Sequence, residues 1–184
     1  MEQRDLSFPA GYDPRRQKLV GTFAAQLDNE LEKLNKLVSD LAVEQLQRQF
    51  APGRNSIGML IAHNAMVEVF WVNVAAAGMR LETGGEEVIR RTIGIVSKDD
   101  GMPLPPDGRH PEALAGKTAE EYLAMMAAAR RVTHATLQQW SDDDLGLTYI
   151  YDDRQFSRRW TVYHVLEHFI SHLGQIRMLK NMMA

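Results

Sequence analysis

Three of the six histidines of this chain follow one another at intervals of four residues near its C-terminal end, at His164, His168 and His172. On an α-helix, four residues advance a side chain by only about 40° past a full turn, so neighbours in this series lie on one face. Neutral imidazole is a common protein ligand for zinc, and it also suits nickel, copper and iron. The spacing therefore predicts a metal site that needs at least one further ligand from another segment.

Helical geometry limits how many of these three residues can bind the same ion. His164 and His172 are separated by about 80° of rotation and about 12 Å along a helix axis. An ion bound by His168 is therefore within reach of only one of the other two. The residues alone leave both pairs open, His164 with His168 and His168 with His172. The competing interpretation of the series is a polar stripe on a partly exposed helix.

His63 is the best candidate for the missing ligand. It lies in an apolar helical segment, with methionine, valine and phenylalanine side chains on neighbouring turns, which points it towards the interior of a bundle. A histidine on an apolar helix face is more often a hydrogen-bonded core residue. Facing helices of a bundle are, however, recognised places for metal sites. The remaining two histidines, His110 and His134, are predicted to be solvated.

Apolar residues recur at helical spacing over most of the chain, and capping patterns mark where the helices begin. Four long amphipathic helices are expected: from just after Pro14 to Val38, from Asn55 or Ser56 to Gly78, from Thr118 to Trp140, and from between Ser157 and Thr161 to about Lys180. Four such helices in one chain predict an all-α four-helix bundle, formed by a single domain over residues 1–184.

Shorter and irregular stretches connect these helices. Residues 82–117 contain six of the thirteen glycines and four of the seven prolines, so they form an irregular excursion between the second and third long helices. A helical turn or two is expected within it, at residues 86–93. Residues 147–151 are β-prone and precede Asp152-Asp153, which predicts a short extended pair. A short helical segment capped by Ser39 or Asp40 is expected to run through Phe50, where Pro52 and Gly53 stop it.

Composition excludes several classes of protein. The chain has 184 residues and no cysteine, so disulfides, thiolate metal sites and a cysteine nucleophile are ruled out. The formal net charge of −3 gives no indication of nucleic-acid binding. No apolar run is expected to reach the roughly 18–20 residues of a membrane span, and residues 1–5 lack a signal-peptide pattern. We therefore expect a cytoplasmic protein with neither nucleic-acid nor membrane partners.

Two segments carry a resemblance to a known family. One is residues 52–63, Pro-Gly-Arg-Asn-Ser-Ile-Gly-Met-Leu-Ile-Ala-His, and the other is the His-x-x-x-His of residues 168–172 followed by Leu-Gly-Gln-Ile. Together they resemble the DinB-like (DinB/YfiT-like) superfamily of four-helix-bundle metalloproteins. That superfamily includes thiol S-transferases dependent on bacillithiol and the mycothiol-dependent maleylpyruvate isomerase. The order and lengths of the expected helices agree with it across nearly the whole chain.

The resemblance implies a specific set of metal ligands. The family pattern places them at His63, His168 and His172, around a divalent ion that is zinc or nickel, with iron or manganese as alternatives. His164 then becomes a residue that lines the pocket or supports a ligand. Gln175 lies three residues after His172 on nearly the same helix face, where it can hydrogen-bond a ligand imidazole or the substrate. Its competing interpretation is a polar contact between helices.

Three neutral histidines around a divalent ion leave coordination positions open, as in catalytic sites. Such an ion activates water for hydrolysis, or it binds a substrate thiolate for transfer to an electrophile. We therefore predict a metal-dependent thiol S-transferase or hydrolase that acts on a small molecule, with a low-molecular-weight thiol as co-substrate of the transferase. The alternative is a non-catalytic metal- or ligand-binding stress-response bundle. The resemblance and the ten methionines also suggest a homodimer.

Overall fold

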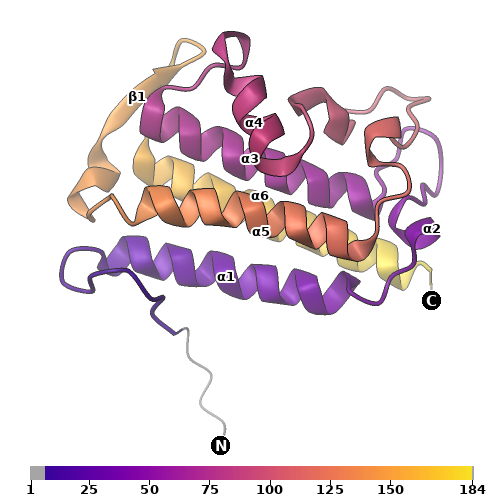
Figure 1. Cartoon of the computed structure of the whole chain (residues 1–184), viewed down its shortest axis with the longest axis horizontal. Helices are drawn as coiled ribbons and strands as arrows, with labels where there is room; N and C mark the ends of the chain where they lie inside the picture. The colour runs from indigo at the N-terminus through magenta and orange to yellow at the C-terminus, as the bar shows by residue number, and fades with distance from the viewer. Residues whose placement is uncertain (1–6, 184) are drawn as a thin grey trace, which may run out of the picture.

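Four long helices run alongside one another in the computed structural model, which describes residues 7–183 (Figure 1). They are α1 (Lys18–Val38), α3 (Ile57–Ala77), α5 (Ala119–Leu137) and α6 (Arg158–Asn181). Both α1 and α3 pack against α5 and against α6, so each long helix has two long neighbours. The predicted all-α bundle is confirmed. Residues 1–6 and 184, which the predicted domain and the signal-peptide argument include, lie outside the described part of the chain.

The ends of the long helices follow the capping residues of the sequence. The Ser56 side chain caps α3 by accepting the Met59 N–H, and Gly78 closes that helix in a left-handed conformation at φ 65°. Thr118 and Glu121 form the expected capping box of α5, and Ser157 caps α6. The third long helix ends earlier than expected, at Leu137 instead of near Trp140.

The short helix α2 (Val43–Leu46) begins later and ends earlier than the sequence suggested. Its N-cap is Ala42, not Ser39 or Asp40, so this capping prediction is wrong. The reason is that Ser39 retains a helical conformation as the C-cap of α1, where its N–H donates to the Asn35 carbonyl. The Gln45 side chain accepts the Ala42 N–H at 2.9 Å, which supplies the capping contact instead.

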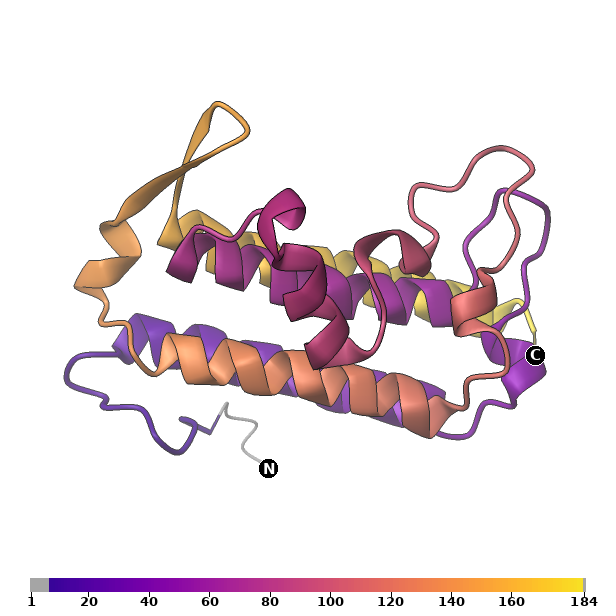
Figure 2. The ribbon, with the colours of Figure 1, turned by 45° about the horizontal axis from the view of Figure 1, so that its top comes forward.

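The connections between the long helices contain short elements where they were expected. The excursion after α3 forms α4 (Gly85–Ile93) and the 3₁₀ turns η1 (Leu81–Thr83), η2 (Ser97–Asp100) and η3 (Glu112–Leu114). Figure 2 shows this excursion passing over α3. Before α6, η4 (Asp143–Gly146) leads into an antiparallel hairpin of β1 (Thr148–Tyr151) and β2 (Arg154–Ser157). The predicted extended pair is therefore present.

Helix α3 is apolar on nearly all sides because it is the central helix of the bundle. It packs against α4, α5 and α6. An 18-residue window of it has a mean hydropathy of 1.4, which is enough to cross a membrane by length and composition, so the expectation that no segment qualifies is wrong. In the structure, 72% of this window is buried within the protein. Burial in the core therefore accounts for its composition.

Close packing of α3 against α5 predicts that Gly58 tolerates no side chain. A Cβ there would overlap the Tyr122 ring, which is fully buried and whose hydroxyl donates to the Leu114 carbonyl at 3.0 Å. We expect Gly58→Ala to lower the free energy of unfolding by about 1–3 kcal/mol in urea denaturation. Gly174→Ala is the matched control, because a Cβ on this α6 residue meets nothing within 4 Å. The control should be neutral or stabilising by up to about 1 kcal/mol, and equal losses in both variants would contradict the prediction.

Candidate metal centre

Three imidazole rings meet where α3 and α6 run side by side. His63 extends from α3, and His168 and His172 extend from consecutive turns of α6. The Nε2 atom of His168 lies 3.1 Å from that of His63 and 3.2 Å from that of His172. One nitrogen from each ring lies within 4.8 Å of the other two, and all three side chains are half-buried. The structure thus brings together the three residues that the family resemblance selected.

Each of these rings donates a hydrogen bond from its Nδ1–H, opposite the clustered Nε2 atoms, to a separate acceptor. The Nδ1–H of His63 donates to Asp100 Oδ2 at 2.7 Å, and that of His168 donates to Asn64 Oδ1 at 3.0 Å. The Nδ1–H of His172 donates to Gln175 Oε1 at 3.0 Å. Because each Nδ1 carries the proton, each Nε2 presents its lone pair to the same small volume. This is the arrangement by which proteins orient histidine ligands of a metal.

Like Asn64, Asp100 is a residue of this site that the sequence did not reveal. It lies at the end of η2 with no exposed surface, and its second carboxylate oxygen accepts the Met102 N–H at 2.9 Å. Gly101 follows at φ 74°, a left-handed conformation that glycine adopts without strain. In the sequence, Asp99-Asp100-Gly101 reads as an ordinary acidic turn. Asp100 follows His63 by 37 residues in the sequence, and only the folded chain brings its carboxylate into contact with the His63 ring.

The environment of His168 and His172 favours the neutral imidazole, which is the form that binds metal. Burial, with smaller contributions from the neighbouring His172 and His63, lowers the pKa of His168 to about 3. Burial also lowers the pKa of His172, against the opposing effect of its hydrogen bond with Gln175. Three converging lone pairs on neutral nitrogen repel one another unless a cation lies between them. The donor set therefore fits a divalent ion that accepts nitrogen ligands, such as zinc or nickel.

His164 does not join this nitrogen cluster, which resolves the two pairs left open by helical geometry in favour of His168 and His172. Its ring stacks on Trp160 at a centroid distance of 4.6 Å and meets the edge of Trp71 at 5.5 Å. The centroid of His168 is 5.7 Å away. His164 is thus the link between the metal centre and an aromatic cluster formed by Phe70, Trp71, Tyr149, Tyr151, Phe156 and Trp160.

The two histidines predicted to be solvated are half-buried and hydrogen-bonded instead. His110 Nδ1 lies 2.8 Å from Ser56 Oγ, and burial lowers its pKa. His134 bonds Tyr12 through Nδ1 at 2.8 Å and Asp28 through Nε2 at 2.9 Å. Both predictions were wrong because the partners come from segments more than 50 residues away in sequence. The Glu167 side chain is exposed.

The sequence of this chain matches a known protein family. Residues 26–176 match the DinB superfamily, which covers most of the chain. The protein belongs to the DinB superfamily. No sequence among curated proteins matches it.

Two solved structures show the same fold at low sequence identity. A conserved protein from Enterococcus faecalis is 16% identical, with a TM-score of 0.65 over 88% of this chain and 95% of that one. A DinB-like protein from Bacillus cereus is 20% identical, with a TM-score of 0.54 over 89% of this chain and 91% of that one. The mostly helical DinB fold with a small hairpin is therefore established for this chain.

The buried contact between Asp100 and His63 predicts that the carboxylate strengthens metal binding. In Asp100→Asn, the acceptor oxygen remains but the negative charge is lost. We expect zinc affinity to fall about 10- to 100-fold, measured by competition with a chromophoric chelator. Asp107→Asn is the matched control, because it removes the same charge from an exposed position of the same excursion. Equal affinities of the two variants would rule out this role for Asp100.

The lowered pKa of His168 predicts an acid-sensitive metal-free protein. Below pH 6.5 the unfolded chain takes up a proton at His168 while the folded chain does not, so stability falls as the pH decreases towards about 3. We expect urea denaturation in the presence of a chelator to show this loss between pH 7 and pH 5. It should be shallower in His168→Gln, which removes that proton uptake. Parallel pH dependences of the two proteins would contradict the prediction.

Proposed function

We propose that this DinB-superfamily protein is a metal-dependent thiol S-transferase acting on a small molecule. The observation that carries the proposal is the convergence of three Nε2 lone pairs, each with its Nδ1–H held by a separate acceptor. His63, His168 and His172 would hold a divalent ion that accepts nitrogen ligands, such as zinc or nickel. Once bound, that ion supplies a Lewis-acid centre with open positions, which stabilises a thiolate at neutral pH.

The surroundings of the cluster favour thiol transfer over hydrolysis. A metal-dependent hydrolase of this kind commonly uses a separate carboxylate as general base beside the attacking water. The carboxylate that bonds the cluster is Asp100, and its two oxygens are committed to His63 and to the Met102 N–H behind the ring. Deprotonation of a thiol on coordination requires no such base. Hydrolysis remains the second candidate because an open position also accepts water.

Three further properties are proposed with the function. A low-molecular-weight thiol is the co-substrate, and the protein acts in the cytoplasm without nucleic-acid or membrane partners, consistent with its small net charge of −3. It forms a homodimer. Support for the dimer comes from Tyr163 and Ile170, which lie seven residues apart on α6 with 53% and 46% of their surfaces exposed. Two turns of a helix place such residues on one face.

The test begins with elemental analysis of protein purified without added metal. Stoichiometric divalent metal is expected in the wild-type protein and is expected to be lost in His63→Ala, His168→Ala and His172→Ala. The wild-type protein should then transfer thiols to 1-chloro-2,4-dinitrobenzene in a screen of cysteine, glutathione, coenzyme A, bacillithiol and mycothiol. Each alanine variant should be slower by about 100-fold or more.

His134→Gln serves as the control variant, because His134 lies outside the metal centre and its replacement keeps a hydrogen-bonding side chain. Hydrolysis of 4-nitrophenyl acetate is measured in parallel, and metal-dependent hydrolysis without thiol transfer would favour the second candidate. Bound metal with neither reaction would instead support the non-catalytic bundle. A wild-type protein that binds no stoichiometric metal would overturn the proposal.

A further inference from the structure

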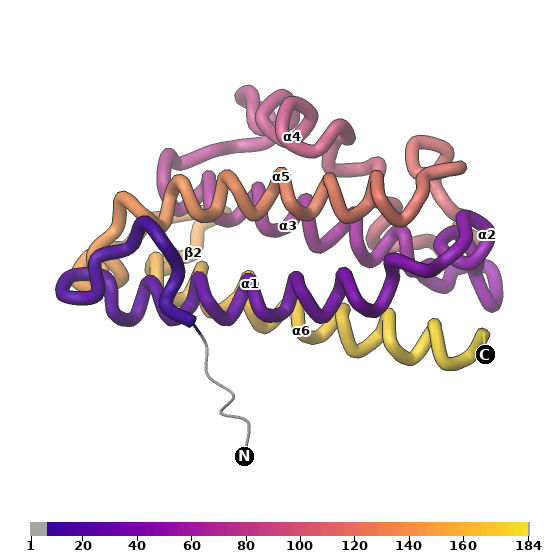
Figure 3. Tube along the Cα trace, turned by 60° about the horizontal axis from the view of Figure 1, so that its bottom comes forward, coloured from indigo at the N-terminus to yellow at the C-terminus, as the bar shows by residue number. Residues whose placement is uncertain are grey.

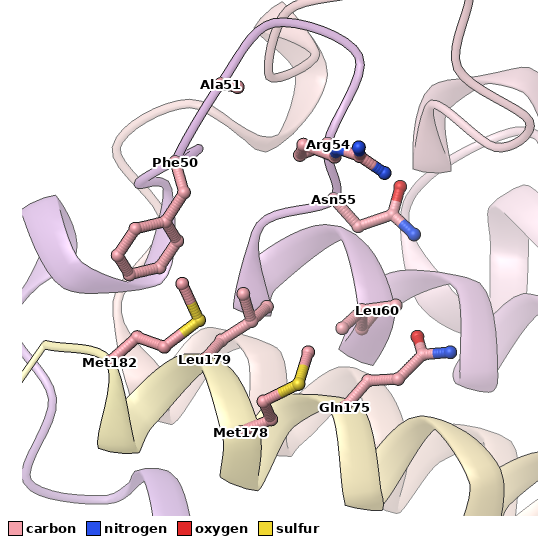
Figure 4. Close-up of a pocket in the computed structure, with 9 residues that line it drawn as sticks. All are labelled: Phe50, Ala51, Arg54, Asn55, Leu60, Gln175, Met178, Leu179 and Met182. Atoms are coloured by element: carbon pink, nitrogen blue, oxygen red, sulfur yellow. The ribbon is translucent and has the colours of Figure 1, made fainter.

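An apolar groove of about 440 Å³ lies at the C-terminal end of α6, next to the start of α3. Figure 4 shows it between α6 and the segment that joins α2 to α3. Its apolar lining comes from Phe50, Leu60, Met178, Leu179 and Met182. Met178 and Met182 are 56% and 55% exposed, so these flexible, polarisable side chains line the open side of the groove.

Polar groups gather at one end of this groove. Arg54, Asn55 and Gln175 lie together there, whereas Phe50 and Met182 lie at the opposite end (Figure 4). No carboxylate lines the groove, and within residues 7–183 Arg54 forms no ion pair. The one charged side chain that lines the groove in the described part of the chain is therefore a cation at its polar end, which complements an anion.

The polar end is also the end nearest the metal centre. Gln175 lines the groove, and its Oε1 accepts the Nδ1–H of His172 at 3.0 Å. The amide nitrogen of Gln175 keeps two N–H donors for a ligand, because the bond to His172 uses only the oxygen. A group bound at this end would thus lie on the far side of the His172 ring from the three converging nitrogens.

We propose that this groove binds an aliphatic carboxylate of medium chain length. The carboxylate lies among the Arg54 guanidinium and the Asn55 and Gln175 amides, and the hydrocarbon chain follows Met178, Leu179 and Met182 towards Phe50. Charge-assisted hydrogen bonds fix the head group, and burial of methylene groups against apolar side chains supplies most of the affinity. The site is separate from the three nitrogens and does not depend on turnover at the metal.

Methionine methyl signals provide a direct test. The protein is labelled with ¹³C-methyl methionine and titrated with decanoate, and Met178→Leu and Met182→Leu assign the two groove signals. We expect saturable shifts of Met178 and Met182, with no shift of the fully buried Met126 in the core. Decan-1-ol, which has the same chain without the charge, should bind about fivefold more weakly.

Two variants separate charge recognition from general apolar binding. Arg54→Gln should raise the Kd for decanoate about fivefold and leave that for decan-1-ol unchanged. Arg159→Gln, which removes the same charge from an exposed position at the opposite end of α6, should change neither. Equal binding of decanoate by the wild-type and Arg54→Gln proteins would overturn the proposal. Signals of Met178 and Met182 that respond to protein concentration but not to decanoate would also overturn it, because a second copy of the chain would then cover the groove.

Discussion

Three imidazoles can turn their Nε2 lone pairs towards one point only if something holds each ring from behind. In this protein Asp100, Asn64 and Gln175 do so, each by accepting an Nδ1–H. Without those bonds the rings would rotate to relieve the repulsion between lone pairs, and the preference for a cation would be lost. The packing of the long helices and of the excursion between α3 and α5 keeps these three acceptors in place.

Buried charged side chains fix how the helices pack around these acceptors. Asp100 is fully buried at the end of η2, so the excursion must pack closely against α3 to deliver it. Elsewhere on α3, Glu68 receives the Arg130 guanidinium of α5 at 2.8 Å, and Arg130 also bonds Asp28 of α1 at 3.2 Å. A buried charge that loses its partner is strongly destabilising, so these contacts fix how α1, α3 and α5 pack. Figure 3 shows α1 and α6 alongside each other on the face opposite the excursion.

The surface between α3 and α6 has three parts that follow one another along the two helices. At the end next to the hairpin, Trp71 packs against Trp160 and His164. The metal centre occupies the middle, and the apolar groove lies beyond it towards the C-terminus of α6. The antiparallel course of the two helices explains this order. Trp71, late in α3, faces Trp160, early in α6, whereas His63, earlier in α3, faces His168, later in α6. The candidate metal centre thus has an aromatic surface on one side and an aliphatic one on the other.

Local rules determined much of this protein from the sequence alone. Helical periodicity and capping residues such as Ser56, Gly78 and Thr118 predicted the four long helices, since both depend on neighbours within a few residues. The spacing of His168 and His172 predicted two ligands on one helix face for the same reason. Helical spacing did not decide between that pair and His164 with His168; the family pattern selected the first pair, and in the structure His168 and His172 are the two that cluster with His63.

Tertiary structure alone decided everything that depends on contacts between distant segments. Asp100 bonds His63, and His134 bonds Asp28 more than 100 residues away, although neither contact has a local signature. The arrangement of α3 opposite α6 likewise brings His63 to within 3.1 Å of His168. Which side chains become buried together depends on the whole fold, whereas the sequence pattern shows only which residues lie on the same face of one helix. For that reason the sequence indicated the three candidate ligands and one acceptor, Gln175, whereas only the fold revealed Asp100 and Asn64.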